Sequence, residues 1–176
     1  MSTVGYLKTF LKHKTMKHLV EIFKPLIDSI YGPNVALAGL HSLRAHGLVV
    51  TREPEDLDVV IFSPTKQQLD TLAGLDFFRV KQPGVPQYHL DQEVSVKFKK
   101  DGHTIDFLLE HAKCTPDDLL FCEVNGSYYR VQSIKNTIDA KLSFSRKNDA
   151  GAEELRTKDA MDLLDIHANN FRFSYK

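Results

Sequence analysis

The fold is decided by the segment Arg52-Glu53-Pro54-Glu55-Asp56-Leu57-Asp58-Val59-Val60-Ile61-Phe62, in which two alternating carboxylates lead into an apolar run. Residues 57–62 have the length and the β-branched composition of a buried strand. Successive side chains of a strand point to opposite faces, so Asp56 and Asp58 project together while Leu57 and Val59 enter the other side. The segment therefore predicts a core strand that begins with two carboxylates on one face.

Paired carboxylates of this kind are typical ligands of a divalent cation. Their hard oxygens suit Mg²⁺ or Mn²⁺, which keep water molecules and substrate phosphates as their other ligands. Two such ions, about 3.5–4 Å apart, serve in-line displacement at phosphorus. A lone Asp-x-Asp is more often the solvated end of a strand, so the interpretation depends on a further carboxylate.

That carboxylate is Asp106, which lies in a second apolar run over residues 103–110. Residues 94–99 before it alternate apolar with polar side chains, and Asp101-Gly102 is a favoured tight turn, so the two runs predict a hairpin. A carboxylate within an apolar strand is costly unless it is paired or binds a cation. The alternative is an edge-strand aspartate that faces water, but together with Asp56 and Asp58 the residue favours a catalytic metal site.

A glycine turn precedes the carboxylate pair, in Ala38-Gly39-Leu40-His41-Ser42. A turn with little side chain lets the backbone approach a ligand closely, and the first amides of a helix favour the charge of phosphate oxygens. Ser42 adds a hydroxyl one turn later. The sequence thus predicts a place for phosphate beside the predicted metal ligands.

Four motifs together resemble the AbiEii-like family of abortive-infection toxin nucleotidyltransferases, in the DNA polymerase beta superfamily of minimal nucleotidyltransferases. They are similar to the family's glycine pair with a later His-Gly, its arginine four residues before Asp-x-Asp, its helical lysine, and its C-terminal Arg-x-Lys-Asp-x-x-Asp. In this chain they are Ala38-Gly39 with His46-Gly47, Arg52 with Asp56-Leu57-Asp58, Lys141, and Arg156-Thr157-Lys158-Asp159-Ala160-Met161-Asp162. Their common order is far more specific than any one motif.

The resemblance implies transfer of a nucleotidyl group from a nucleoside triphosphate to an acceptor hydroxyl, with release of pyrophosphate and with Mg²⁺ or Mn²⁺ as cofactor. RNA or tRNA, a protein or a small molecule is the implied acceptor, and an antitoxin protein is an implied partner. The residues implied for both metal binding and catalysis are Asp56, Asp58 and Asp106, and Lys141 is implied as a further catalytic residue. The residues implied for nucleotide binding are Gly39, Ser42, Arg52, Lys141, Lys158 and Asp159.

An alternative stays open, because Ala38 and Leu40 depart from the family's Gly-Gly or Gly-Ser motif. It is a catalytically silent nucleotide- or RNA-binding module of the same fold, possessing the site without the reaction. His46 has two interpretations as well, as a nucleotide or carboxylate contact or, more commonly, as a helix cap or packed core group. We interpret Asp165 as an exposed helical residue.

The remaining pattern predicts an α/β (α+β) fold, with a mixed sheet flanked by helices and a C-terminal helical pair. We expect strands at 35–38, 57–62, 76–80, 119–124 and 128–131, the last two as a hairpin around Asn125-Gly126. We expect helices at 40–45, from a Ser63 N-cap with Pro64 in the first turn to Gly74, and from Ser133 to about Arg146, with Lys141 beside its apolar stripe. Residues 82–86 are expected to form a loop, and a last helix carries Asp159 and Asp162 on one face.

Composition agrees with one domain over residues 1–176, comprising a catalytic sheet region (1–132) and C-terminal helices (133–176), because 176 residues with 42% hydrophobic content can bury a core. There is no signal peptide or membrane-spanning run, so a cytoplasmic protein with reduced Cys114 and Cys122 is expected. The formal net charge is zero, which argues against a surface built wholly for nucleic acid. A basic N-terminal helix leaves a local RNA contact open, although a solvated helix face is the commoner explanation.

Overall fold

Five helices and eight strands make up the described part of the chain. The computed structural model describes residues 14–75, 95–110, 120–143, 146–147 and 149–174. In chain order the elements are α1 (Lys14–Ile30), β1 (Val35–Leu37), α2 (Gly39–Ala45), β2 (Asp56–Phe62), α3 (Lys66–Gly74), β3 (Ser95–Lys100), β4 (His103–Glu110), β5 (Leu120–Val124), β6 (Ser127–Val131), α4 (Ile134–Ser143), β7 (Arg146–Lys147), β8 (Glu153–Glu154) and α5 (Thr157–Ser174).

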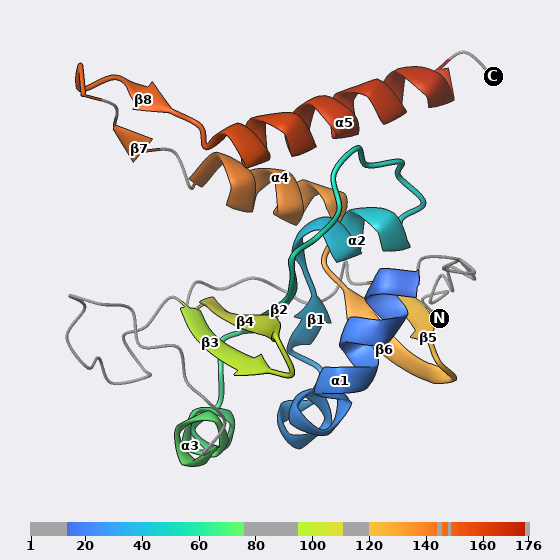
Figure 1. The fold of residues 1–176 in the computed structure, drawn as a ribbon, viewed down its shortest axis with the longest axis vertical. Coiled ribbons are helices and arrows are strands. Elements are labelled where there is room, and N and C mark those ends of the chain that lie inside the picture. Colours follow the sequence, from blue (N-terminus) through green and yellow to red (C-terminus); the bar gives the residue numbers. More distant parts are fainter. Residues whose placement is uncertain (1–13, 76–94, 111–119, 144–145, 148, 175–176) are drawn as a thin grey trace, which may run out of the picture.

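Six of the strands form one mixed sheet in the order β3-β4-β2-β1-β6-β5 (Figure 1). The β2 strand runs parallel to β4 and antiparallel to β1, and β1 is parallel to β6. The remaining two strands, β7 and β8, form a separate two-stranded sheet. The predicted mixed sheet with flanking helices is therefore confirmed, and β2 lies near its middle.

Two hairpins close as the sequence predicts. Asp101-Gly102 joins β3 to β4, and Asn125-Gly126 joins β5 to β6. All four turn residues have positive φ, from 52° to 80°, as a type I′ turn requires and as these residue types tolerate. The tight turns fix the register of each hairpin and therefore which side chains share a face.

The main core lies on one face of the sheet, beneath α1 and α3. Leu57, Val59 and Ile61 of β2 are fully buried there, with alternate residues of β4. The apolar stripe of α1 covers them, as the spacing of its residues predicts: Leu19, Val20, Phe23, Ile27 and Ile30 are all buried. The predicted alternation of β2 is thus confirmed, and its even-numbered residues point to the other face.

A second helical layer lies at that other side, where α2, α4 and α5 pack together (Figure 1). Leu40 and Leu43 of α2 contact Ile134 and Ile138 of α4 and Ile166 of α5 in a small separate core. The predicted pair of C-terminal helices is confirmed as α4 and α5. This layer matters for function because it lies beside the carboxylates of β2.

The start of α3 differs from the prediction. The N-cap is Thr65, not Ser63: the Thr65 side chain accepts from the Gln68 amide, while the Gln68 side chain accepts from the Thr65 amide. This reciprocal capping box satisfies two helix-end donors, whereas Ser63 has a positive φ of 44°. The predicted end at Gly74 is confirmed. Likewise α4 ends at Ser143, before the predicted Arg146, which belongs to β7.

Several sequence predictions concern residues outside the described ranges. They are the strand at 76–80, the loop at 82–86, the state of Cys114, and the basic residues before Lys14. Within the described ranges, Lys24 of α1 pairs with Asp28 at 2.8 Å and lies above the ring of Tyr129. Cys122 is a free, buried core residue. No helix among the described residues has the length and apolar character needed to cross a bilayer.

Candidate active site

Asp58 and Asp106 are direct neighbours across the parallel pair of β2 and β4. Asp56 lies two residues before Asp58, opposite Thr104 in the same register. All three carboxylates belong to the face of the sheet away from the main core, because β2 and β4 bury their odd-numbered residues against α1 and α3. The structure therefore brings together the three residues predicted to hold metal.

Charge repulsion and burial act together on Asp58. Burial, followed by the nearby charges of Asp56 and Asp106, raises the pKa of its carboxyl to about 7, against the opposing effect of Lys141 and Lys158. Burial raises the pKa of Asp106 as well, against the opposing effect of Lys97. Negative charge is therefore concentrated here beyond what the surroundings neutralise, which is the electrostatic condition for binding a cation.

Asp106 is only half satisfied by its hydrogen bonds. Its Oδ2 forms an ion pair with Lys97 of β3 at 3.2 Å. Its Oδ1 is buried and has no hydrogen-bond partner among the described residues. Lys97 was not among the predicted site residues, although the Asp101-Gly102 turn sets the register that places it opposite Asp106.

Gly39 lies against the carboxylate of Asp58. It has a φ of 61°, in the left-handed region, and a Cβ at this position would overlap Asp58 Oδ2 and lie 3.1 Å from its Cγ. The backbone of the preceding residue is fixed to the same strand, since the Ala38 amide donates to the Asp58 carbonyl at 2.9 Å. Glycine is thus required here by both conformation and space.

Ser42 is fully buried inside the helical layer. Its hydroxyl donates to the Gly39 carbonyl at 2.7 Å and contacts the Thr137 hydroxyl of α4 at 3.0 Å. These bonds hold the glycine turn in place. In this arrangement Ser42 supports the turn from within, and its predicted contact with nucleotide stays a prediction.

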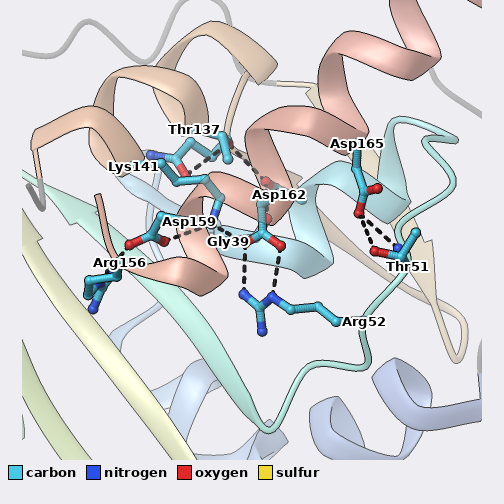
Figure 2. A network of polar contacts seen from close by, with 11 residues as sticks. Gly39, Thr51, Arg52, Thr137, Lys141, Arg156, Asp159, Asp162 and Asp165 are labelled. Carbon is cyan, nitrogen blue, oxygen red and sulfur yellow. Dashed lines mark hydrogen bonds and ion pairs between the residues drawn. The ribbon is translucent and has the colours of Figure 1, made fainter. Parts of the chain in front are cut away.

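A buried network of charges joins the helical layer to the segment before β2 (Figure 2). Asp162 of α5 has no exposed surface and binds Arg52 bidentately, with Nε at 2.8 Å and Nη2 at 2.7 Å. Lys141 of α4 reaches the same carboxylate at 2.6 Å and Asp159 at 3.4 Å, and Arg156 pairs with Asp159. Burial by itself raises the pKa of Asp162, but the hydrogen bonds from Arg52 and Lys141 prevail and lower it.

Three residues predicted to bind nucleotide, namely Arg52, Lys141 and Asp159, thus belong to this network. Lys141 and Asp159 are buried, and Arg52 is about one quarter exposed. Lys158 is different: it is exposed on α5, and its charge still acts on Asp58. Asp162 was predicted to share a face with Asp159 and to belong to the C-terminal motif, but its bonds to Arg52 and Lys141 were not predicted.

Two histidines and one aspartate near the site have structural partners. His46, at the end of α2, contacts the Gln132 carbonyl at 2.9 Å through Nε2, as a helix-end packing group does. His41 is buried and contacts the Asp56 carbonyl at 3.1 Å; burial lowers its pKa to about 4, so the ring is neutral and donates from Nε2. Asp165, expected to be a simple exposed residue, instead accepts from the Thr51 amide at 2.8 Å and from the Thr51 hydroxyl at 3.0 Å.

The residues present suit a hard divalent cation that is completed by other ligands. Among the described residues, no group of three or more His, Cys, Asp or Glu side chains is arranged to hold a metal ion. Mg²⁺ is commonly bound by one or two carboxylates, with water and substrate phosphates filling the remaining positions. The unpaired Oδ1 of Asp106 and the raised pKa of Asp58 fit such an open site.

Comparison with known proteins adds two solved structures from Helicobacter pylori. One is described as a candidate nucleotidyltransferase, with 15% identity and a TM-score of 0.46; the other is the protein JHP933, with 16% identity and a TM-score of 0.43. Each alignment covers 86% of this chain but only 67% and 65% of the solved chains, so this chain spans about two thirds of their length. No protein-family model and no curated protein matches the chain. Membership of the AbiEii-like family therefore stays a prediction from the motifs.

Proposed function

We propose that this protein is a metal-dependent nucleotidyltransferase. In the proposed reaction an acceptor hydroxyl oxygen forms a bond to the α-phosphorus of a nucleoside triphosphate. The bond from that phosphorus to the bridging oxygen of the β-phosphate breaks, and pyrophosphate leaves with the electron pair. The hydroxyl proton passes to a carboxylate of the site, so the products are the nucleotidylated acceptor and pyrophosphate.

The observation that carries the proposal is the placement of Asp58 opposite Asp106 on neighbouring parallel strands, with Asp56 on the same face. Asp106 is far from Asp56 and Asp58 in sequence, and only the folded sheet makes it their neighbour. A structural role alone gives no reason to collect three like charges where burial raises the pKa of Asp58 to about 7. A catalytic role does, because in-line transfer needs carboxylates to bind cations at the reacting phosphate.

Each carboxylate has a proposed role. Asp56 and Asp58, with Asp106, would hold Mg²⁺ or Mn²⁺, which would supply positive charge to neutralise the phosphates and activate the α-phosphate toward attack. Asp106 is the candidate acceptor of the hydroxyl proton, because its Oδ1 has no hydrogen-bond partner among the described residues. Gly39 lets the backbone lie directly against Asp58.

The cations of the helical layer would complete the binding of a triphosphate. Lys158 is exposed and close enough for its charge to act on Asp58, so it can approach phosphate oxygens without leaving a partner in the described network. Lys141 and Arg52 share Asp162. They would stabilise the charge of the phosphates either while still paired with Asp162 or after exchanging that carboxylate for a substrate phosphate. RNA or tRNA, a protein or a small molecule is the proposed acceptor, and the motif resemblance adds a toxin role with an antitoxin partner.

The test is transfer of label from each α-³²P-labelled nucleoside triphosphate into total tRNA and into the protein itself, with Mg²⁺ or Mn²⁺. Pyrophosphate release is followed in parallel, so that a small-molecule acceptor added to the assay is also detected. Asp58→Asn should abolish transfer, with at least about a hundredfold loss, while the circular dichroism spectrum stays that of the wild type. Asp70→Asn is the matched control, since Asp70 is an exposed α3 residue that pairs with the exposed Lys66.

Transfer that persists in Asp58→Asn would contradict the assignment of the metal ligands. Triphosphate binding without any transfer would instead favour the second candidate, a catalytically silent nucleotide- or RNA-binding module. One observation supports that candidate: Lys141 and Arg52, predicted to bind phosphate, are already engaged by Asp162. Such a module should bind triphosphate equally well after Asp106→Asn.

A further inference from the structure

Lys97 is a cation already placed beside one of the proposed metal ligands. It lies directly opposite Asp106 in the β3–β4 hairpin, with Nζ 3.2 Å from Oδ2. The Asp106 side chain is only 10% exposed and that of Lys97 is 32% exposed, so water screens the pair only in part. Val96 and Phe98 are buried in the main core, which commits Lys97 to the opposite face, where the carboxylates lie.

The charge of Lys97 acts on more than its direct partner. Burial alone would lower the pKa of Lys97, but Asp106 raises it, with smaller contributions of the same sign from Asp56 and Asp58. The ammonium therefore interacts favourably with all three carboxylates. A divalent cation bound by the same residues would have to overcome that attraction and then experience repulsion from the displaced ammonium.

We infer that Lys97 is a positioning residue that competes with the divalent cation for Asp106. The inference rests on the proposed function and deepens it. Lys97 weakens binding of the cation by the protein alone, so the cation is held firmly only when substrate phosphates contribute further charge and ligands. Metal occupancy and nucleotide binding are thereby coupled through one side chain.

The test measures binding of Mn²⁺ alone, without nucleotide, from the loss of the electron paramagnetic resonance signal of free aqueous Mn²⁺. Four proteins are compared with the wild type: Lys97→Met, Lys97→Arg, Lys99→Met and Asp58→Asn. Lys99 is the matched control, because it lies two residues along β3 on the same face, is exposed, and faces Thr104 instead of a carboxylate. Circular dichroism establishes folding, and Lys97→Gln replaces Lys97→Met should the latter misfold.

We expect Lys97→Met to bind Mn²⁺ about fivefold more tightly than the wild type, or more, from loss of a partly buried charge pair. Lys97→Arg should stay near the wild type because it keeps the charge. Lys99→Met should change the affinity by less than about twofold, since an exposed charge is screened.

Two kinds of failure are distinguishable. Wild-type binding that Asp58→Asn abolishes, with Lys97→Met unchanged or matched by Lys99→Met, would overturn the role of Lys97 and leave the proposed function standing. Absence of Mn²⁺ binding in every protein up to millimolar concentration, or full binding by Asp58→Asn, would overturn the proposed metal site and this inference with it.

Discussion

Gly39 is the residue on which the position of Asp58 depends most directly. Its φ of 61° strains any L side chain, and a Cβ would overlap Asp58 Oδ2. Gly39→Ala should therefore lower the free energy of unfolding by about 2–3 kcal/mol, from left-handed strain and displacement of the carboxylate. Urea denaturation at neutral pH measures the loss, and turnover should fall with it.

Substitutions at two other glycines separate the two causes of this loss, left-handed strain and displacement of the Asp58 carboxylate. Gly47 has a φ of 80° but open space around its Cβ position, so Gly47→Ala reports left-handed strain alone, at about 1 kcal/mol. Gly74 has neither positive φ nor a neighbour within 4 Å, so Gly74→Ala should be neutral or slightly stabilising. A Gly39→Ala loss no larger than that of Gly47→Ala would show that Asp58 does not constrain the position.

The charge of Asp58 should lower the stability of the folded protein at neutral pH. Its carboxyl has a pKa raised to about 7, against about 3.9 in the unfolded chain. A raised pKa stabilises the folded state below the unfolded value, and that contribution is lost as pH rises through 7. Asp58→Asn should therefore be more stable than the wild type at pH 8 without metal, by on the order of 4 kcal/mol, and the difference should vanish near pH 4.

His41 has the opposite effect on the pH dependence of stability between pH 4 and 8. Its pKa is lowered to about 4, so the neutral ring contributes stability that is complete above about 6.5 and lost as pH falls toward 4. Urea denaturation of Asp58→Asn at several pH values between 4 and 8 should show this slope without the compensation from Asp58. A constant difference between variant and wild type across that range would contradict the prediction for Asp58.

The sequence predicted well to which face of the sheet a side chain points, where that face depends on neighbouring residues along the chain. Asp56 and Asp58 share a face because a strand alternates, and the Asp101-Gly102 turn already implies that Lys97 faces Asp106. The role of Asp162 could not be found in this way. Its partner Arg52 is 110 residues away, and the local pattern places Asp162 on a helix face with Asp159 without indicating that partner.

Among the elements, α3 shows how two local signals compete for a helix start. Ser63-Pro64 suits an N-cap followed by a first-turn proline, but Thr65 and Gln68 satisfy each other's backbone amides. Two hydrogen bonds outweigh one, and the helix begins at Lys66. Gln68 is further fixed because its side chain donates to the Ile30 carbonyl and to Asn34 Oδ1.

Thr65→Ala should accordingly destabilise the protein by about 1 kcal/mol, because the Gln68 amide loses its side-chain acceptor. Ser63→Ala is the control and should change the free energy of unfolding by less than about 0.5 kcal/mol. Thermal and urea denaturation both measure the difference. Equal losses in the free energy of unfolding of the two variants would indicate that Ser63 caps the helix, as the sequence predicts.

Hairpins and helices were predictable because each is specified by a short segment, whereas the strand order was not. The tight turns fix β3–β4 and β5–β6, but the parallel pairing of β2 with β4 crosses more than 40 residues, part of them outside the described ranges. Only that pairing places Asp58 beside Asp106. The sequence therefore supplied the three candidate carboxylates, and the topology of the sheet supplied their arrangement.

At the scale of the whole molecule, Asp162 joins three parts of the fold. It lies on α5, binds Lys141 of α4, and holds Arg52 in the segment that leads into Asp56 and β2 (Figure 2). Neighbouring bonds strengthen the attachment, since Asn169 of α5 donates to the Val49 carbonyl and accepts from the Val49 amide. The helical layer thus fixes the path by which the chain enters the carboxylate site.

Asp162→Asn should therefore act on both stability and site. Removing one partner of a buried ion pair leaves Arg52 and Lys141 with excess positive charge, and we expect a loss of about 3–5 kcal/mol in the free energy of unfolding. Hydrogen exchange should rise over residues 49–58, where the chain loses its anchor on α5. Asp139→Asn is the matched control, an exposed carboxylate on α4 paired with Lys135, and should cost no more than about 0.5 kcal/mol. Similar small losses in both variants, with unchanged exchange over 49–58, would mean that α5 packs on α2 and α4 through apolar contacts alone and does not position the carboxylates.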